Sequence, residues 1–465
     1  MAVSRRRFLK SLGGGALGAA SFLSGADRLF QMNAWADPTG GPYEDYKALV
    51  CVFLYGGNDA NNTVIPYAEA EYQAYAAARG SLAFERDALL PLKAANGDPA
   101  YALHPSLSGL QSLWDGGKLA ILANAGPLVY PFASRQDYLK RSVQTPYQLF
   151  SHSDQQTAWQ SSEARGSATT GWGGRLASYT RNPTDSLPNT IAINDGDLFS
   201  TGVGASPLVI PAAPTELSRA LTLNHPGDQS PNSTYRRMLE NAGGRDAPAL
   251  VRAAARIMAQ SLETSMELSV NPTLTQSFSW SGLGNQLLQA AKLIKFAQTV
   301  GIRRQVICCS MGGFDTHTSQ GTTWGSHAGL MQELSTALTE FHGATQELGL
   351  ADRITTFTMS EFSRTLKPNG EGGGAGTDHA WGGHHFILGD AVRGGAMYGR
   401  FPQMLPDGED DADSGAEARG RWIPSSSVDQ YAATLARWFG VNDGDLAYLF
   451  PNLKNFDSQD LGFMA

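Results

Sequence analysis

The stretch ALVCVFLY at positions 48–55 is the part of the sequence that decides the fold. It is apolar throughout and ends at a glycine pair, Gly56 and Gly57. Because apolar and polar residues do not alternate, the stretch predicts a strand that is buried on both faces, as in a parallel sheet. Polar residues follow at 58–63, so this strand would carry polar groups at its carboxyl end.

Further apolar runs of strand length occur along the chain, at 118–124, 305–310, 353–359 and 385–388. Apolar residues recur at helical spacing in three other segments, at 285–300, 326–348 and 428–439. The order strand, helix, strand predicts a crossover between parallel strands. We therefore expect an α/β fold with a mostly parallel central sheet flanked by helices.

The segment 181–231 differs in composition from the rest of the chain. It is rich in Pro, Asn, Ser and Thr and has only short apolar pieces. This composition predicts an irregular insertion, a lid region rather than sheet core.

The first 36 residues predict a removable twin-arginine signal peptide. Arg5 and Arg6 stand shortly before an apolar, small-residue stretch at 12–23, and Ala34 and Ala36 are the small residues that a signal peptidase reads. The apolar stretch is shorter than the roughly 20 residues that span a bilayer, so we expect no stable membrane anchor. The expected partner is the twin-arginine translocase, and the mature domain at 37–465 would be periplasmic or secreted.

The composition is that of a globular protein with a sizeable core, since 42% of residues are hydrophobic and 17% are charged. The net charge of -8 argues against a nucleic-acid partner, whose phosphates require a basic face. Three cysteines without regular spacing do not predict a disulfide framework. Export of a folded protein often accompanies a cofactor loaded beforehand, which favours a metal.

Acidic residues and histidines follow the predicted strand ends, where open parallel sheets bind their ligands. Crowded carboxylates raise one another's pKa unless a cation is present. A mixed carboxylate and imidazole shell suits zinc, manganese or a similar divalent ion. The predicted metal ligands are Asp59, Asp315, His317, Glu361, Asp378 and His379.

Most of these residues also have an ordinary structural interpretation. Asp59 could cap the helix after the first strand. Asp315 and His317 could form a solvated turn, and Asp378 could be hydrogen-bonded to His379.

Glu361 is harder to explain in this way, because an unpaired carboxylate at the end of a buried strand is costly. His384 and His385 cannot face the same side of one strand, so at most one of them should reach the site. His104 is interpreted as a helix-entry residue and not as a ligand.

A second cluster, SHSDQQTAW at 151–159, places Ser151 at a predicted helix N-terminus, where backbone N–H groups favour an anion. Ser151 is our predicted nucleophile for phosphoryl or sulfuryl transfer, although a serine there can equally be an N-cap. The alternatives are a water at the metal and Thr63, which precedes an apolar stretch that turns it inward. His152 could orient the serine or supply a further ligand, and Arg364 is the other candidate catalytic residue.

The blocks GGNDANNTVIP, SHSDQQTAW with GWGGR, GGFDTH with Gln320, and SEFSRT with GTDHAWGG resemble an exported family, the domain of unknown function 1501. The resemblance runs from about residue 47 to residue 450. That family is similar to the alkaline-phosphatase-like superfamily, which includes sulfatases and phosphoglycerate mutases. The resemblance implies a parallel sheet between helices with a metal site at the strand ends.

By position, Asp59 resembles the first-strand metal ligand of the superfamily, Ser151 its nucleophile, and Asp315 and His317 the Asp and His ligands of another metal. Glu361 and His379 resemble a later aspartate and the last histidine. The resemblance implies one or two divalent ions. The pattern departs at Phe362, where the superfamily has a histidine, and in the shorter spacing from 315 to 317, and both departures argue against the full two-metal site.

The function that these observations predict is hydrolysis of a small phosphate or sulfate ester by a metal-dependent exported enzyme. The alternative is an exported protein without catalytic activity that keeps the fold for surface binding or assembly.

Overall fold

The computed structural model describes residues 43–465, apart from 95–96, 183–184, 186, 204–205, 218–240, 242–247 and 249–270. The chain forms two compact units, Met1–Glu44 and Asp45–Ala465, and the fold below is that of the second unit. The predicted signal peptide at 1–36 lies outside the described residues. In the described part of the chain, no helix is long and apolar enough to cross a membrane.

A mixed, mostly parallel sheet forms the centre of this unit. In the described residues it has nine strands in the order β11-β5-β10-β9-β1-β8-β6-β7, with β12 paired to β5. The predicted long strands are confirmed as β1 (Lys47–Leu54), β5 (Leu119–Gly126), β8 (Arg304–Met311) and β9 (Ile354–Met359). The others are β6 (Thr190–Ile193), β7 (Leu208–Ile210), β10 (Gly383–Leu388), β11 (Ala396–Gly399) and β12 (Ser426–Ser427).

β1 lies between two parallel partners, β8 and β9. Cys51 of β1 lies opposite Cys308 on one side and Phe357 on the other. Val50 packs into the hydrophobic core on one face of the sheet, and Cys51 packs into the core on the other face. Both faces of this strand are therefore buried, which is what its continuous apolar run predicted.

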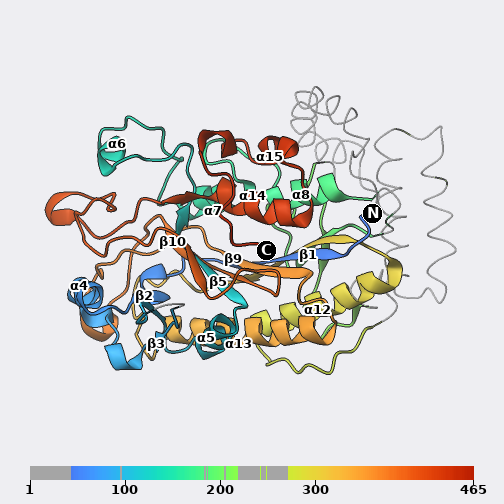
Figure 1. Cartoon of the computed structure of the whole chain (residues 1–465), viewed down its shortest axis with the longest axis horizontal. Helices are drawn as coiled ribbons and strands as arrows, with labels where there is room; N and C mark the ends of the chain where they lie inside the picture. The colour runs from blue at the N-terminus through green and yellow to red at the C-terminus, as the bar shows by residue number, and fades with distance from the viewer. Residues whose placement is uncertain are drawn as a thin grey trace, which may run out of the picture. The chain divides into compact units, whose positions relative to one another are not determined.

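Helices cover both faces of the sheet (Figure 1). One face packs against α5 (Ser108–Asp115), α12 (Gly282–Val300) and α13 (Ser326–Glu347). The other packs against α7 (His152–Ser161), α8 (Trp172–Thr180), α14 (Val428–Phe439) and α15 (Asp443–Leu449). The three helices predicted from apolar spacing correspond to α12, α13 and α14, and the α/β fold is confirmed.

A small antiparallel sheet lies beside the central one. It consists of β2 (Val64–Pro66), β4 (Tyr101–Leu103) and β3 (Leu90–Pro91) in that order. α4 (Glu69–Arg79) packs near it and ends at Arg79, whose side chain is fully buried. A short helix, α6 (Arg135–Leu139), follows β5 in the chain.

The prediction that 181–231 lies outside the sheet is wrong for the described part of that segment. β6 pairs in parallel with β8, and β7 pairs in parallel with β6. These strands have only four and three residues, so their apolar signal was too short to stand out from the polar loop between them. Residues 218–231 lie outside the described residues.

β10 runs antiparallel to both of its neighbours, β5 and β9. Its two histidines face opposite sides, as expected. The ring of His384 stacks on Phe401 at 4.6 Å between centroids, whereas the ring of His385 lies 4.5 Å from Trp159 and 6.0 Å from Tyr431. Both rings are buried, so each belongs to a core and not to an open site.

His385 should make the protein sensitive to acid, because burial lowers its pKa to about 3 and neither ring nitrogen has a hydrogen-bond partner among the described residues. An unfolded histidine has a pKa near 6.5, so between these values the unfolded state binds the extra proton and stability falls as pH falls. Between pH 6.5 and 5 the loss is about 2 kcal/mol for this one group. Urea unfolding of His385→Phe should show a flatter dependence on pH than the wild type, and two parallel curves would contradict the prediction.

Candidate metal centre

The sheet brings four loops to one edge. β1, β8 and β9 are parallel, so the residues that follow each of them leave at the same edge. β10 runs in the opposite direction, so the residues that precede it return to that edge. Asp315, His317, Glu361, Asp378 and His379 are therefore neighbours, although they are distant in the sequence.

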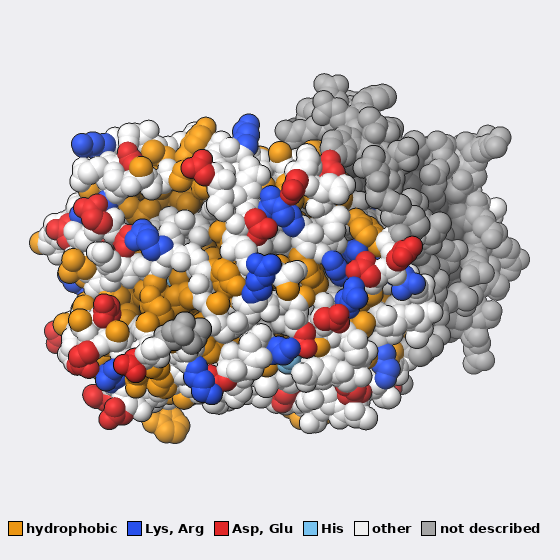
Figure 2. Space-filling model, in the orientation of Figure 1, with side chains coloured by type: hydrophobic (Ala, Val, Ile, Leu, Met, Phe, Trp, Pro, Cys, Tyr) orange, Lys and Arg blue, Asp and Glu red, His pale blue; other side chains and the backbone are white. Residues whose placement is uncertain are grey.

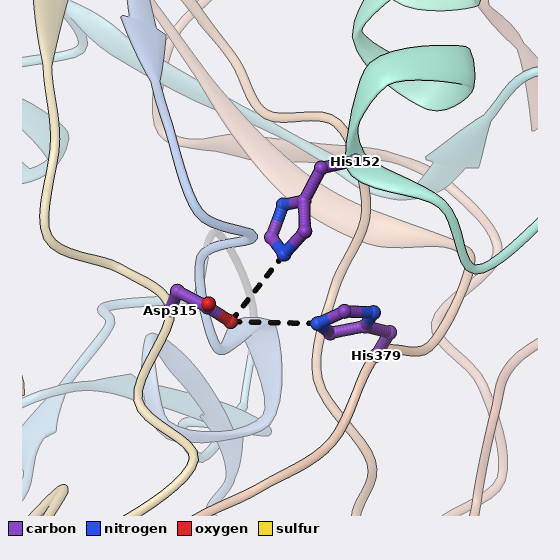
Figure 3. A group of neighbouring side chains, drawn as sticks. All are labelled: His152, Asp315 and His379. Atoms are coloured by element: carbon purple, nitrogen blue, oxygen red, sulfur yellow. Dashed lines mark ion pairs between the residues drawn. The ribbon is translucent and has the colours of Figure 1, made fainter.

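Three side chains at this edge converge on one point (Figure 3). One ligand atom from each of His152, Asp315 and His379 lies within 4.8 Å of the other two. The Nε2 atoms of His152 and His379 lie 3.5 and 3.4 Å from Oδ1 of Asp315. His317 joins from another side, with its Nε2 3.1 Å from the same oxygen and 2.9 Å from Nε2 of His379. The distances from Asp315 Oδ1 to His152 and His379 are close to the roughly 3.3 Å that separates neighbouring ligand atoms around a tetrahedral zinc ion. His317 contacts two of the three residues and lies outside the three-residue group.

The opposite nitrogen of each ring is held by an acceptor. Nδ1 of His152 is 2.9 Å from Oε1 of Glu361, and Nδ1 of His317 is 2.9 Å from Oδ1 of Asp378. Nδ1 of His379 is 2.7 Å from the carbonyl oxygen of Phe150, which can only accept a hydrogen bond. Histidines that bind metals typically donate their second N–H to such a carboxylate or carbonyl.

This arrangement leaves lone pairs facing one another. In the neutral form of each ring, the hydrogen is on Nδ1 and Nε2 has only a lone pair. Burial lowers the pKa of His379, so the neutral form of this ring is favoured. Its Nε2 lies 2.9 Å from another imidazole nitrogen and 3.4 Å from a carboxylate oxygen, which is repulsive unless a shared proton or a metal cation lies among them. The donor set therefore fits a divalent metal ion.

The carboxylates of the cluster favour their ionised forms. Burial would raise the pKa of Asp315, but Arg364, His317 and His152 outweigh it and the pKa is lowered. Burial is likewise outweighed at Asp378, where Asn369, His317 and Arg419 lower the pKa. The side chain of Asp315 is 47% exposed, so the cluster remains accessible to solvent and to a small substrate.

Glu361 and Asp378 contact the histidines at their Nδ1 atoms, and Glu361 Oε2 has no hydrogen-bond partner among the described residues. Oε1 of Glu361 accepts from the Gly56 N–H at 2.8 Å, from Gln156 Nε2 at 3.0 Å and from His152. Asp378 accepts from His317 and pairs with Arg419. Both were predicted as direct ligands, and the structure instead places them against the Nδ1 atoms of His152 and His317.

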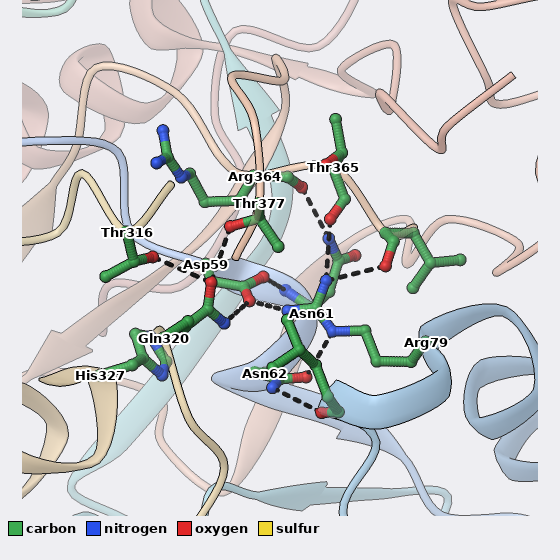
Figure 4. A network of polar contacts seen from close by, with 12 residues as sticks. Asp59, Asn61, Asn62, Arg79, Thr316, Gln320, His327, Arg364, Thr365 and Thr377 are labelled. Atoms are coloured by element: carbon green, nitrogen blue, oxygen red, sulfur yellow. Dashed lines mark hydrogen bonds and ion pairs between the residues drawn. The ribbon is translucent and has the colours of Figure 1, made fainter. Parts of the chain in front are cut away.

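Asp59 belongs to a separate network of polar contacts (Figure 4) and not to the group of His152, Asp315 and His379. It is fully buried, forms an ion pair with Arg79 and accepts a hydrogen bond from Gln320 Nε2 at 2.5 Å. Its Oδ1 accepts from the Asn61 N–H at 3.2 Å, so it caps the short helix that follows β1. The capping alternative is therefore confirmed, and a guanidinium already neutralises this predicted metal ligand.

The two candidate catalytic residues take different positions. Arg364 is buried beside the cluster and donates from Nη2 to Asp315 Oδ1 at 3.0 Å, while its Nε and Nη1 have no hydrogen-bond partner among the described residues. Ser151 is the residue before α7, and its hydroxyl donates to Asp154 Oδ2 at 2.6 Å. Thr63 is fully buried and donates to the Asp59 carbonyl at 2.7 Å, which agrees with its inward orientation.

Close backbone contacts set the positions of these loops. Gly56 has φ +114°, and a Cβ there would lie 2.4 Å from the amide nitrogen of Asp315. A Cβ on Gly376 would lie 2.2 Å from the carbonyl of His317. The ring of Phe362 stacks on His379 at 4.6 Å and lies 4.8 Å from His152, which fixes two of the imidazoles from behind.

Comparison with protein families gives a match over most of the chain. The family described as "Protein of unknown function (DUF1501)" matches residues 46–413. The chain belongs to this family. The comparison confirms the resemblance seen in the sequence, and the match includes every residue of the cluster.

Two solved structures show what this DUF1501 member is distantly similar to. Ps i-CgsB in complex with k-i-k-neocarrahexaose aligns with 89% of this chain and 77% of its own, at 9% identity and a TM-score of 0.37. The PsFucS1 sulfatase from Pseudoalteromonas sp. aligns with 89% of this chain and 70% of its own, at 10% identity and a TM-score of 0.33. No curated protein matches this DUF1501 sequence.

Sequence reasoning on this DUF1501 chain undervalued His152 and missed Arg79. His152 was named only as a residue that could orient Ser151 or supply a further ligand, because its position at the start of α7 gave no indication that the ring points away from the helix toward Asp315. Arg79 ends an amphipathic helix, where a basic residue usually complements the helix dipole. No sequence signal linked it to Asp59.

Proposed function

We propose that this protein is an exported, metal-dependent hydrolase of phosphate or sulfate esters. The observation that carries the proposal is the convergence of three imidazole Nε2 atoms on one carboxylate oxygen, with each Nδ1 held by an acceptor. A structural core would not gather four such acceptor groups at a solvent-accessible sheet edge.

His152, His379 and Asp315 would hold the ion, and His317 lies beside them, with its Nε2 2.9 Å from Nε2 of His379. An imidazole-rich donor set favours zinc over manganese, which prefers oxygen ligands. We propose one ion and not two, because Arg79 already neutralises Asp59. When bound, the ion would supply Lewis-acid polarisation of the ester group.

The chain also offers donors for the anionic part of a phosphate or sulfate ester. Nε and Nη1 of Arg364 have no hydrogen-bond partner in the described residues, and Nη2 of the same side chain donates to Asp315. The first turn of α7 begins at His152, and the N–H groups of a first helical turn have no partner within the helix. Both features favour a bound anion beside the cluster.

Ser151 remains our candidate nucleophile. Its hydroxyl proton is directed at Asp154 Oδ2, so Asp154 is placed to accept that proton when Ser151 attacks an ester. The sequence alone did not suggest this role for Asp154. It follows from the hydrogen bond in the structure.

The direct test is a panel of aryl phosphate and aryl sulfate esters, assayed with zinc-loaded and with chelator-treated protein. Turnover that requires the metal supports the proposal. Metal binding without turnover on any ester of the panel would favour the alternative, an exported protein that keeps the fold for binding.

Ser151→Ala should abolish turnover while the zinc content stays at the wild-type level. The substitution removes the attacking oxygen and none of the proposed ligands. Thr157→Ala is a matched control, because Thr157 is also a hydroxyl residue of α7 and its Oγ1 donates to the Ser153 carbonyl at 2.8 Å. Near-normal kcat in Ser151→Ala would assign the attack to water.

Replacing Arg5 and Arg6 with lysine should keep the protein in the cytoplasm with its first 36 residues uncleaved. The twin-arginine pathway reads this pair, and lysine keeps the charge without the guanidinium groups. Cell fractionation and N-terminal sequencing measure the outcome. Normal export of the double variant would remove the proposed route.

A further inference from the structure

Gln320 is the centre of a buried hydrogen-bond network that includes residues adjacent in sequence to those of the metal centre (Figure 4). Its side chain is fully buried. Its Oε1 accepts from Thr316 Oγ1 at 2.9 Å and from Thr377 Oγ1 at 2.7 Å, and its Nε2 donates to Asp59 Oδ2 at 2.5 Å. A single amide thus joins three loops.

The two threonines stand next to proposed ligands. Thr316 lies between Asp315 and His317 in the sequence, and Thr377 comes two residues before His379. The backbones of these loops also meet, since the Thr377 N–H donates to the Thr316 carbonyl at 3.0 Å. Any shift of Gln320 therefore acts on both loops that supply ligands.

The other end of the network is anchored by Arg79. Besides its ion pair with Asp59, Arg79 donates from Nη1 to the carbonyls of Thr365 and Leu366, both at 2.8 Å. These residues directly follow Arg364, which contacts Asp315. The network therefore reaches the loop after β9 as well.

The chemistry of the network gives Gln320 one orientation. An ionised carboxylate only accepts hydrogen bonds, so the amide must turn its NH₂ group toward Asp59. Its oxygen is then the acceptor for both threonine hydroxyls. Glutamate in this position would face Asp59 with a like charge, and an aliphatic side chain would leave both hydroxyls without their acceptor.

We propose that Gln320 is a positioning residue of the metal centre, which sets the spacing between the loop carrying Asp315 and His317 and the loop carrying His379. The inference rests on the proposed function, since it requires that these residues bind the ion. Groups that orient metal ligands from behind typically change metal affinity about 10–100-fold when they are removed.

The experiment measures cobalt(II) binding by the purified full chain, with affinity and the visible absorption spectrum as readouts that do not depend on turnover. Gln320→Leu should bind cobalt about 10–100-fold more weakly and show an altered spectrum, because the ligand loops lose their common acceptor. The double variant Thr316→Val, Thr377→Val keeps Gln320 and should show the same direction of change, which covers the case in which Gln320→Leu does not fold.

Gln289→Leu is the matched control. Gln289 is equally buried but donates to the carbonyl of Thr215 at 3.1 Å, away from the ligand loops. Gln289 makes this one side-chain hydrogen bond, and its Oε1 has no partner among the described residues, so the substitution should lower stability less than Gln320→Leu does and leave cobalt affinity unchanged. Wild-type affinity and spectrum in the Gln320 and threonine variants would overturn the positioning role alone. A wild type that binds no cobalt would overturn the metal centre and this inference with it.

Discussion

Replacing His379 with alanine should leave the purified protein without its divalent ion and without ester hydrolysis. His379 supplies the Nε2 that lies close to both Asp315 and His317, so its loss opens the centre of the ligand set. The effect should exceed the roughly 10–100-fold loss of affinity expected when a group behind a ligand is removed. Metal content after dialysis, measured by elemental analysis, tests this directly.

His342→Ala is a suitable control for this prediction. His342 is also a buried histidine, but it lies on α13, where its Nε2 is 3.6 Å from Oδ1 of Asp390. It should keep a full metal content. Retention of the ion in His379→Ala would contradict the proposed ligand set, whatever the activity of the variant.

Replacing Arg79 with methionine should cost about 3–5 kcal/mol of unfolding free energy, because the Asp59 carboxylate would remain buried without its counter-ion. Neither side chain has any solvent exposure, so water cannot replace the guanidinium. Urea unfolding measures the loss. The double variant Arg79→Met, Asp59→Asn should recover part of it, since the uncompensated charge is removed with its partner.

Lys93→Met provides the comparison for an exposed ion pair. Lys93 Nζ lies 3.0 Å from Asp115 Oδ2, and the Lys93 side chain is 75% exposed. Such pairs contribute about 0–1 kcal/mol, so this variant should unfold near the wild-type urea concentration. Equal effects of the Arg79 and Lys93 substitutions would show that Asp59 does not depend on Arg79.

The sequence was sufficient to predict the main strands and the edge at which the site lies. Apolar runs identified β1, β5, β8 and β9. Strands that are covered on both faces do not alternate between polar and apolar residues, so they stand out as such runs. The polar residues after β8 and before β10 then had to meet at one edge. β6 and β7 were missed because a run of three or four apolar residues carries too little signal.

The roles within the site were less predictable, because they depend on where each side chain points. Asp315 and Glu361 both follow the carboxyl ends of strands, but only Asp315 faces the imidazole Nε2 atoms. From the sequence, Asp59 was as reasonable a metal ligand as Asp315, because its ion pair with Arg79 could not be foreseen. That partner lies 20 residues away on another element, and neither charge nor spacing reveals such a contact.

The pairing of β1 with β8 and β9 has a consequence for the order of events during synthesis. The Gly56 N–H reaches Glu361 across 305 residues of sequence, so the centre of the sheet can close only after most of the chain has left the ribosome. Folding dominated by such distant contacts is slow. Asp315 and the histidines can meet only when that closure is complete. A chain that crosses the membrane after folding would therefore need a waiting period inside the cell, during which the ion could be acquired.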